Sequence, residues 1–162
     1  MIRFDVSALT KARLGTSLTL QLNTGPQALT DLKVDFLRGV IQAIRVQGGL
    51  LIRGSIDSQL DLDCVRCLES FVVPVTLELE ETFRLSGASP TSDAPYAVSG
   101  DGWIDLAPVL RELIWVSIPL KPVCNPDCRG LCPQCGANLN IESCTCQETQ
   151  IDPRWALLKD LL

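Results

Sequence analysis

Thiols are the side chains that stand out in this chain. Eight cysteines are present, and six of them fall in one short stretch, "CNPDCRGLCPQCGANLNIESCTC", at positions 124–146. Thiolates bind zinc in tetrahedral groups of four, and a chain without histidine has only thiolates or carboxylates to offer zinc. The spacing therefore predicts one or two structural zinc ions with these ligands: Cys64, Cys67, Cys124, Cys128, Cys132, Cys135, Cys144 and Cys146.

Two divisions of the eight cysteines into groups of four are open. In the first, the nearest neighbours form a local site, and the other four fasten the tail to an upstream hairpin. The local site is then Cys132, Cys135, Cys144 and Cys146, and the shared site is Cys64, Cys67, Cys124 and Cys128. In the second division, Cys124, Cys128, Cys132 and Cys135 form one site, and the upstream pair joins Cys144 and Cys146.

Four thiolates close the metal's coordination shell, whereas catalytic zinc keeps one position open for water. Histidine, the usual proton carrier, is also absent from the chain. We therefore assign no catalytic residue and expect a protein that is not an enzyme. Two alternatives stay open: a thiol-redox or metal-dependent enzyme, and a zinc-ribbon adaptor that binds a protein partner.

The expected compartment favours metal binding over disulfides. The N-terminal segment "MIRFDVSALTKARLG" lacks the apolar core of a signal peptide, and no stretch is apolar enough for a membrane helix. We therefore expect a cytoplasmic protein without membrane contact, whose thiols stay reduced.

The charge of the chain argues against strong binding to nucleic acid. The formal net charge is −5, whereas affinity for RNA comes largely from basic residues that neutralise phosphates. Direct contact with RNA is thus expected to be weak. The 46% hydrophobic and 20% charged residues are typical of a globular protein.

Alternating apolar and polar residues predict strands at 15–22, 39–64 and 71–85. Gly48-Gly49 predicts a tight turn within the second region. The stretch from Cys64 to Cys67 then forms the tip of a second hairpin, and Pro74 marks an edge or a bulge.

Residues 86–102 are rich in Ser, Gly, Pro and Asp and predict a mobile loop. "IDLAPVLRELIWVSIPL" at 104–120 predicts a helix, with Asp105 as its cap and Pro108 in its first turn. Its apolar stripe is Leu106, Leu110, Leu113 and Ile114. A short terminal helix is expected at 151–162, opened by Asp152 and Pro153.

These elements predict an α+β fold. Residues 1–122 form an antiparallel β-rich domain with a helix at 105–118, and barrel-like closure is one option. Residues 123–162 form the zinc-binding, cysteine-rich C-terminal tail, with a short helix packed on it.

Four motifs, in this order, resemble the YceD family of large ribosomal RNA subunit accumulation proteins. They are "LDLDCVRCLESF", "IDLAPVLRELIWVSIPL", "CNPDCRGLCPQCGANLN" and "DPRWALLKDLL". The resemblance implies a factor for 23S ribosomal RNA accumulation or processing and for large-subunit biogenesis. The implied partners are the large-subunit precursor or its processing and assembly proteins. Since chloroplast proteins of this kind exist, the plastid stroma is a second expected location.

The family implies no catalytic residue, and not all its members carry the cysteine-rich tail, so zinc is a structural option on the fold. Because the chain is acidic, we expect it to act mainly through protein contacts. The exposed sides of the helices at 105–118 and 152–162, with Arg111, Arg154 and Trp155, are the expected surface.

Overall fold

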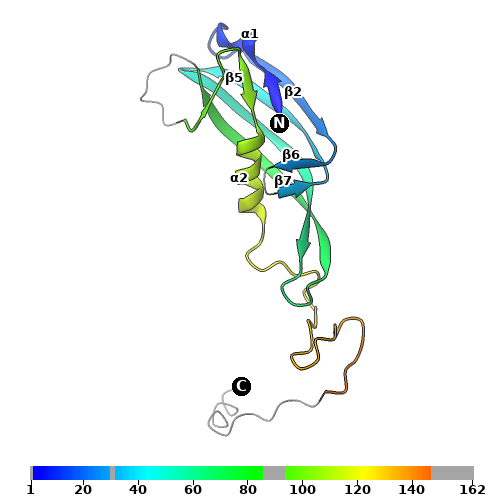
Figure 1. Ribbon diagram of the computed structural model, residues 1–162. Helices are drawn as coiled ribbons and strands as arrows, with labels where there is room; N and C mark the ends of the chain where they lie inside the picture. Colours follow the sequence, from blue (N-terminus) through cyan, green and yellow to red (C-terminus); the bar gives the residue numbers. More distant parts are fainter. Residues whose placement is uncertain (1, 30–31, 86–93, 147–162) are drawn as a thin grey trace, which may run out of the picture.

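The computed structural model describes residues 2–29, 32–85 and 94–146. In this part of the chain, nine strands and two helices are formed (Figure 1). In chain order they are β1 (Arg3–Asp5), α1 (Ser7–Thr10), β2 (Ser17–Thr24), β3 (Gln27–Leu29), β4 (Leu32–Val34), β5 (Leu37–Val46), β6 (Gly49–Asp63), β7 (Ser70–Arg84), β8 (Tyr96–Ala97), β9 (Trp103–Asp105) and α2 (Ala107–Ser117).

The main sheet has the strand order β2-β5-β6-β7-β8. Its pairs are antiparallel except for β8, which runs parallel to β7. Two short two-stranded sheets, β1-β9 and β3-β4, accompany it. The sheet is open, with β2 and β8 as its edge strands, so the barrel-like option is wrong for the described residues. Helix α2 lies against the sheet (Figure 1). Its apolar side chains cover the core face of the sheet, so that this face is buried although the sheet does not close into a barrel.

The long β6–β7 hairpin extends the sheet toward the tail. Each strand has 15 residues, and β6 continues beyond the end of β5, whose Leu37 pairs with Ser58. The register of β6 with β7 is unbroken from Gly49↔Arg84 to Asp63↔Ser70. Pro74 therefore lies in no bulge, and the outer side of β7 at this residue is an edge, which a residue without an N–H tolerates.

The predicted strands are confirmed, with small shifts at their ends. The turn between β5 and β6 uses Gly48 at φ 77°, the left-handed region that favours glycine. Gly49 already belongs to β6 and pairs with Val46. The turn thus lies one residue earlier than the Gly48-Gly49 pair suggested.

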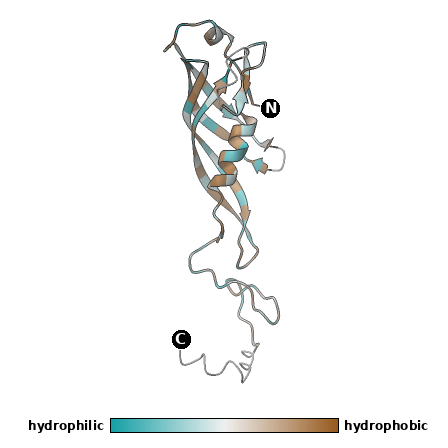
Figure 2. Ribbon diagram, turned by 90° about the vertical axis from the view of Figure 1, so that its left-hand side faces the viewer, coloured by the Kyte–Doolittle hydropathy of each residue, from teal (hydrophilic) through white to brown (hydrophobic). Residues whose placement is uncertain are grey.

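Helix α2 buries most of its predicted stripe against the sheet, and Leu113 of that stripe is partly buried. Leu106, Leu110 and Ile114 are fully buried in one core with Ile52, Ile56 and Phe83, among others. Brown and teal residues alternate along the strands and around the helix, as expected for a fold with one buried face (Figure 2). No helix in the described ranges is long and apolar enough to cross a membrane.

The start of α2 differs slightly from the prediction. Residues 103–105 form β9, which pairs with β1, so the helix begins at Ala107. Asp105 still supports its first turn, because Oδ1 of Asp105 accepts the N–H of Ala107 at 3.0 Å.

The predicted loop at 86–102 is partly structured. Residues 86–93 lie outside the described residues, but β8 follows them, and the Tyr96 ring stacks on Phe83 with centroids 5.3 Å apart. Val98 is also buried. The predicted loop is therefore wrong for residues 96–98, which pair and pack against the body. The terminal helix expected at 151–162 lies outside the described residues.

Candidate metal centre

The tip of the β6–β7 hairpin places two cysteines on one side of a tight turn. The N–H of Cys64 donates to the carbonyl of Glu69 at 3.0 Å, and the N–H of Leu68 donates to the carbonyl of Cys64 at 2.9 Å. Leu68 adopts φ 60°, a left-handed conformation that costs a non-glycine residue about 1 kcal/mol. Both thiols of the turn, Cys64 and Cys67, are buried.

The tail is fastened to this hairpin tip by backbone groups as well as by cysteines. The N–H of Val65 donates to the carbonyl of Pro122 at 2.9 Å, and the N–H of Leu131 donates to the carbonyl of Arg66 at 3.1 Å. Gly130, at φ 74°, passes so close that a Cβ there would lie 3.0 Å from the Arg66 carbonyl oxygen. Glycine is therefore the residue that lets the tail follow the hairpin at this position without strain.

Arg66 adds a side-chain clamp at the same place. Its Nη1 donates to the carbonyl of Cys128 at 3.0 Å and to the carbonyl of Pro126 at 3.2 Å. The guanidinium thus holds the backbone of the loop between Cys124 and Cys128.

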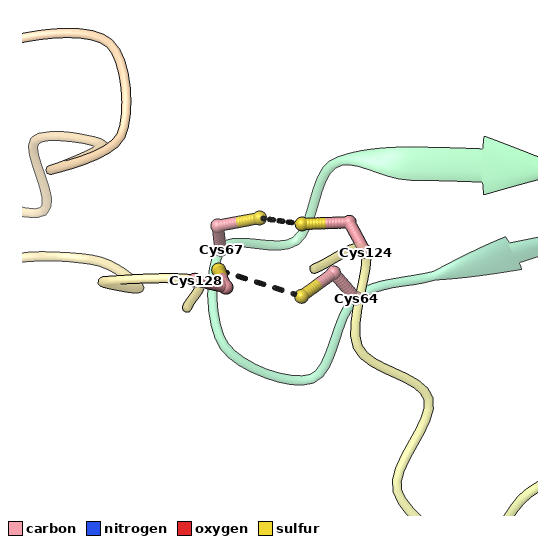
Figure 3. A group of neighbouring side chains, drawn as sticks. All are labelled: Cys64, Cys67, Cys124 and Cys128. Carbon is pink, nitrogen blue, oxygen red and sulfur yellow. Dashed lines mark hydrogen bonds between the residues drawn. The ribbon is translucent and has the colours of Figure 1, made fainter. Parts of the chain in front are cut away.

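These contacts bring Cys64, Cys67, Cys124 and Cys128 together, and we name them the proximal cluster. Their four Sγ atoms all lie within 4.8 Å of one another. Figure 3 shows the thiols of hairpin and tail pointing toward each other, with Cys67 and Cys124 at 3.7 Å and Cys64 and Cys128 at 3.8 Å. Cys124 is the exposed member, while the other three are buried.

The remaining cysteines form a second group within the tail, the distal cluster: Cys132, Cys135, Cys144 and Cys146. Their Sγ atoms also lie within 4.8 Å of one another. A tight turn begins the group, since the N–H of Gly136 donates to the carbonyl of Cys132 at 2.9 Å and Gly136 adopts φ 75°. Cys132 is buried, Cys144 is half-buried, and Cys135 and Cys146 are exposed.

The structure therefore groups the cysteines as in the first predicted division and not as in the second. All eight predicted ligands are placed in one cluster or the other. The distant hairpin pair completes a group with Cys124 and Cys128, and the close set stays local.

Both groups fit a tetrahedral ion with four sulfur ligands. With a metal–sulfur distance of roughly 2.3 Å, tetrahedral geometry puts neighbouring sulfurs about 3.8 Å apart. The separations of 3.7 Å and 3.8 Å in the proximal cluster agree with this spacing, and the distal sulfurs all lie within 4.8 Å of one another. All eight thiols are free rather than joined in disulfides. The donor set and its spacing could thus hold a metal ion in each cluster.

Hydrogen bonds to sulfur lower the pKa of Cys64 and Cys128 in the proximal cluster and of Cys132 in the distal cluster, which favours the thiolate. Burial alone would raise the pKa of Cys64, but the amides of Cys124, Cys67 and Arg66 lower that pKa to about 6. The amides of Cys135 and Gln134 lower the pKa of Cys132, also to about 6. Amides aimed at sulfur are typical of thiolate metal sites, because they stabilise the charged ligand.

Cys124 and Cys146 show the opposite effect. Burial, and then hydrogen bonding among the sulfurs, raises the pKa of Cys124 to about 12. Hydrogen bonding with Cys135, and then burial, raises the pKa of Cys146 to about 12. Four close thiols cannot all ionise at neutral pH without a cation among them, which is the condition that a bound metal ion satisfies.

Sequence reasoning missed the residues that support the clusters. Arg66 donates to the backbone carbonyl of Cys128, and Asn140 donates to the sulfur of Cys128. Asn138 donates to the Glu69 side chain of the hairpin. A signal was present in the sequence, because "GANLN" places two amide side chains between the cysteine pairs of the tail. Nothing in the spacing, however, tells which cluster they reach.

Comparison with known proteins gives a family match over much of the chain. The family model described as "Large ribosomal RNA subunit accumulation protein YceD" matches residues 52–162. This stretch is more than half of the chain and includes both clusters. The chain belongs to the YceD family.

Relatives in bacteria and plants extend the YceD similarity over most of the chain. The Mycobacterium tuberculosis protein Rv2926c is 33% identical over 154 residues, which cover 93% of this chain and 69% of the relative. YlbN of Bacillus subtilis is 29% identical, covering 89% of this chain and 85% of its own length. The maize protein named "Large ribosomal RNA subunit accumulation protein YCED homolog 1, chloroplastic" is 29% identical and is covered over 53% of its length. No solved structure matches the chain.

Proposed function

We propose that this chain is a non-enzymatic factor for the accumulation and processing of 23S ribosomal RNA, and hence for large-subunit biogenesis. The observation that carries the proposal is the YceD match over residues 52–162. The matched stretch is also the stretch that builds the hairpin tip, α2 and the tail. The working location is the cytoplasm, or the stroma if the chain is of plastid origin.

The proposed architecture is a β-rich body, residues 1–122, carrying a zinc-binding tail, residues 123–162, whose short C-terminal helix packs on the tail. Each cluster is proposed to hold one structural zinc ion, with all eight cysteines as ligands. Four sulfur ligands in a tetrahedron are typical of zinc sites, and iron is the other metal commonly bound by such a ligand set. Elemental analysis separates the two.

A thiol-redox or metal-dependent enzyme is the less favoured reading. The pair Cys64 and Cys67 lies on a hairpin turn and not at a helix N-terminus, where thioredoxin-like pairs are activated. Each pair also has two further thiols within contact distance, so four-sulfur binding competes with any redox use.

The charge distribution supports action through proteins. The β6–β7 hairpin carries seven carboxylates against three arginines, which accounts for most of the net charge of −5. Exposed Asp57 and Glu78 accept hydrogen bonds from Thr76 and Ser55, and Asp57 also lies opposite Arg38 in the β5–β6 register. A surface with this excess of carboxylates repels phosphates and attracts basic polypeptides. We therefore expect it to bind large-subunit proteins or processing factors rather than naked RNA.

On the opposite side of the fold, α2 presents exposed Trp115 and Val116 beside Arg111. This surface, together with Arg154 and Trp155 in the tail, is our proposed site of protein contact.

Depletion of the protein in its native cell tests the proposal. We expect mature 23S ribosomal RNA and free large subunits to fall while the small subunit and its RNA are spared. Affinity purification of the intact chain should bring down large-subunit precursors or their assembly proteins. Unchanged ratios of the two ribosomal RNAs after complete depletion would remove the proposal.

A further inference from the structure

Residues 137–140 of the tail contact both clusters. In sequence they lie between Cys135 and Cys144, so they belong to the loop that the distal cluster closes. In space, Nδ2 of Asn140 donates to Sγ of Cys128 at 3.3 Å. A side chain from the distal loop thus supports a sulfur of the proximal cluster.

The Asn140 amide is held in one orientation by its neighbours. Its Oδ1 accepts the N–H of Arg129 at 2.8 Å, and its Nδ2 also donates to Oδ1 of Asn138 at 2.9 Å. Because the oxygen faces an N–H donor, the amide nitrogen must face the sulfur. Asn138 in turn donates to Glu69 of the hairpin at 3.3 Å.

Backbone bonds tie this loop to the short link between the clusters. The N–H of Cys132 donates to the carbonyl of Ala137 at 2.8 Å, and the N–H of Leu139 donates to the carbonyl of Gly130 at 3.0 Å. Only three residues separate Cys128 from Cys132. Order in the distal loop therefore restrains the position of Cys128.

The two clusters differ in the chain entropy lost when they form. All distal cysteines lie between positions 132 and 146, so this cluster closes within one segment, whereas the proximal cluster requires the tail to dock on the hairpin tip. A contact within one short segment costs less chain entropy than the docking of two separate parts of the chain. The distal cluster is thus the one expected to form first.

From these contacts we infer that the two clusters bind metal cooperatively, the distal cluster first, and that Asn140 is the positioning residue that couples them. The inference rests on the metal binding proposed above. The distal loop, once ordered, presents Asn140 to Cys128 and so preorganises the site that fastens the tail to the sheet. Coupling of binding free energies is reciprocal, so each filled cluster strengthens the other by the same factor.

Titration of the reduced, metal-free, full-length chain with Co²⁺ tests this inference through the absorption of cobalt–thiolate sites. The second binding step of the wild-type chain is compared with the single step of a chain carrying Cys132→Ser, Cys135→Ser, Cys144→Ser and Cys146→Ser. Loss of a residue that supports a metal ligand typically weakens affinity about 10- to 100-fold. We expect the affinity of the proximal site for Co²⁺ in the four-serine chain to be at least about 10-fold lower than the affinity of the second step in the wild-type chain.

Asn140→Ala keeps all eight cysteines and isolates the link. It should weaken the second step about 10-fold and leave the first step unchanged. Ile141→Ala is the matched control, because Ile141 is the next residue and its side chain is 76% exposed. Two bound ions with equal affinities in wild type and Asn140→Ala would overturn the coupling but leave the metal sites standing. A wild-type chain that binds no metal would overturn both.

Discussion

Sγ of Cys64 lies 3.8 Å from Sγ of Cys128, although the two residues are 64 positions apart in the sequence. One belongs to the tip of the β6–β7 hairpin, and the other belongs to the tail. Contact between them joins the rigid sheet to a segment that has little secondary structure of its own. The proximal cluster is therefore a fastening point, and its loss should be visible in the tail first.

The purified chain, made with zinc and reductant, should contain two zinc ions. A strong chelator should remove them and release the tail, while the β-sheet core stays folded because it is built from apolar contacts. Elemental analysis gives the metal content, and circular dichroism with limited proteolysis follows the two parts. Metal-free protein with a protected tail would contradict this prediction.

Cys67→Ser should cost one zinc ion and expose residues 120–146 to proteases. The remaining three sulfurs close only part of a tetrahedron, so the tail loses its anchor. Val65→Ala is the control in the same turn, since the side chain of Val65 is exposed. Unchanged zinc content in Cys67→Ser would mean that the hairpin thiols only pack.

Arg66→Ala should loosen the tail even when zinc is present. The substitution removes the two hydrogen bonds from Nη1 to the carbonyls of Pro126 and Cys128, worth about 1 to 3 kcal/mol together. Hydrogen exchange of tail amides measures the effect. Arg53→Ala is the matched control, because Arg53 is exposed on the sheet and its guanidinium donates to Oε1 of Gln42.

The body should respond to a different class of change. Ile114→Ala deletes a fully buried side chain of α2 and should destabilise the fold by about 2 to 5 kcal/mol. Val116→Ala, on the exposed side of the same helix, should change stability by less than about 0.5 kcal/mol. Thermal unfolding of both variants compares the two, and equal losses would argue against the burial seen for α2.

The sequence predicts the parts of this fold that local patterns control. The strands from β5 to β7 follow their alternation, and α2 follows its apolar stripe and Asp105. β8 and β9 were missed because they are two and three residues long and exist only through pairing with β7 and β1. A strand that forms only because it pairs with a distant segment leaves no local pattern in the sequence from which it could be predicted.

The candidate site shows the same limit. Counting thiols and their spacings identified the eight ligands and two possible divisions into fours, but it left the choice between the two divisions open until the fold grouped them. The supporting residues Arg66 and Asn140 were invisible, since their roles depend on how the tail crosses the hairpin. Their contacts with the clusters are visible only in the three-dimensional structure.

The purified chain should bind an isolated 23S ribosomal RNA fragment weakly and with little sequence preference. Phosphate neutralisation supplies most RNA affinity, whereas this chain has a net charge of −5 and an acidic β6–β7 hairpin. A gel shift at about 0.15 M salt, where charges are screened beyond roughly 8 Å, is the measurement.

The same chain incubated with large-subunit precursor particles should bind more tightly, because those particles also display basic proteins. Charge reversal at two exposed carboxylates, Asp57→Lys with Glu78→Lys, should weaken binding to the particles. Val40→Ala, on the same exposed sheet face, serves as the control. Tight, salt-sensitive binding of the chain alone to RNA would reject protein contact as the mode of action and leave the ribosomal role in place.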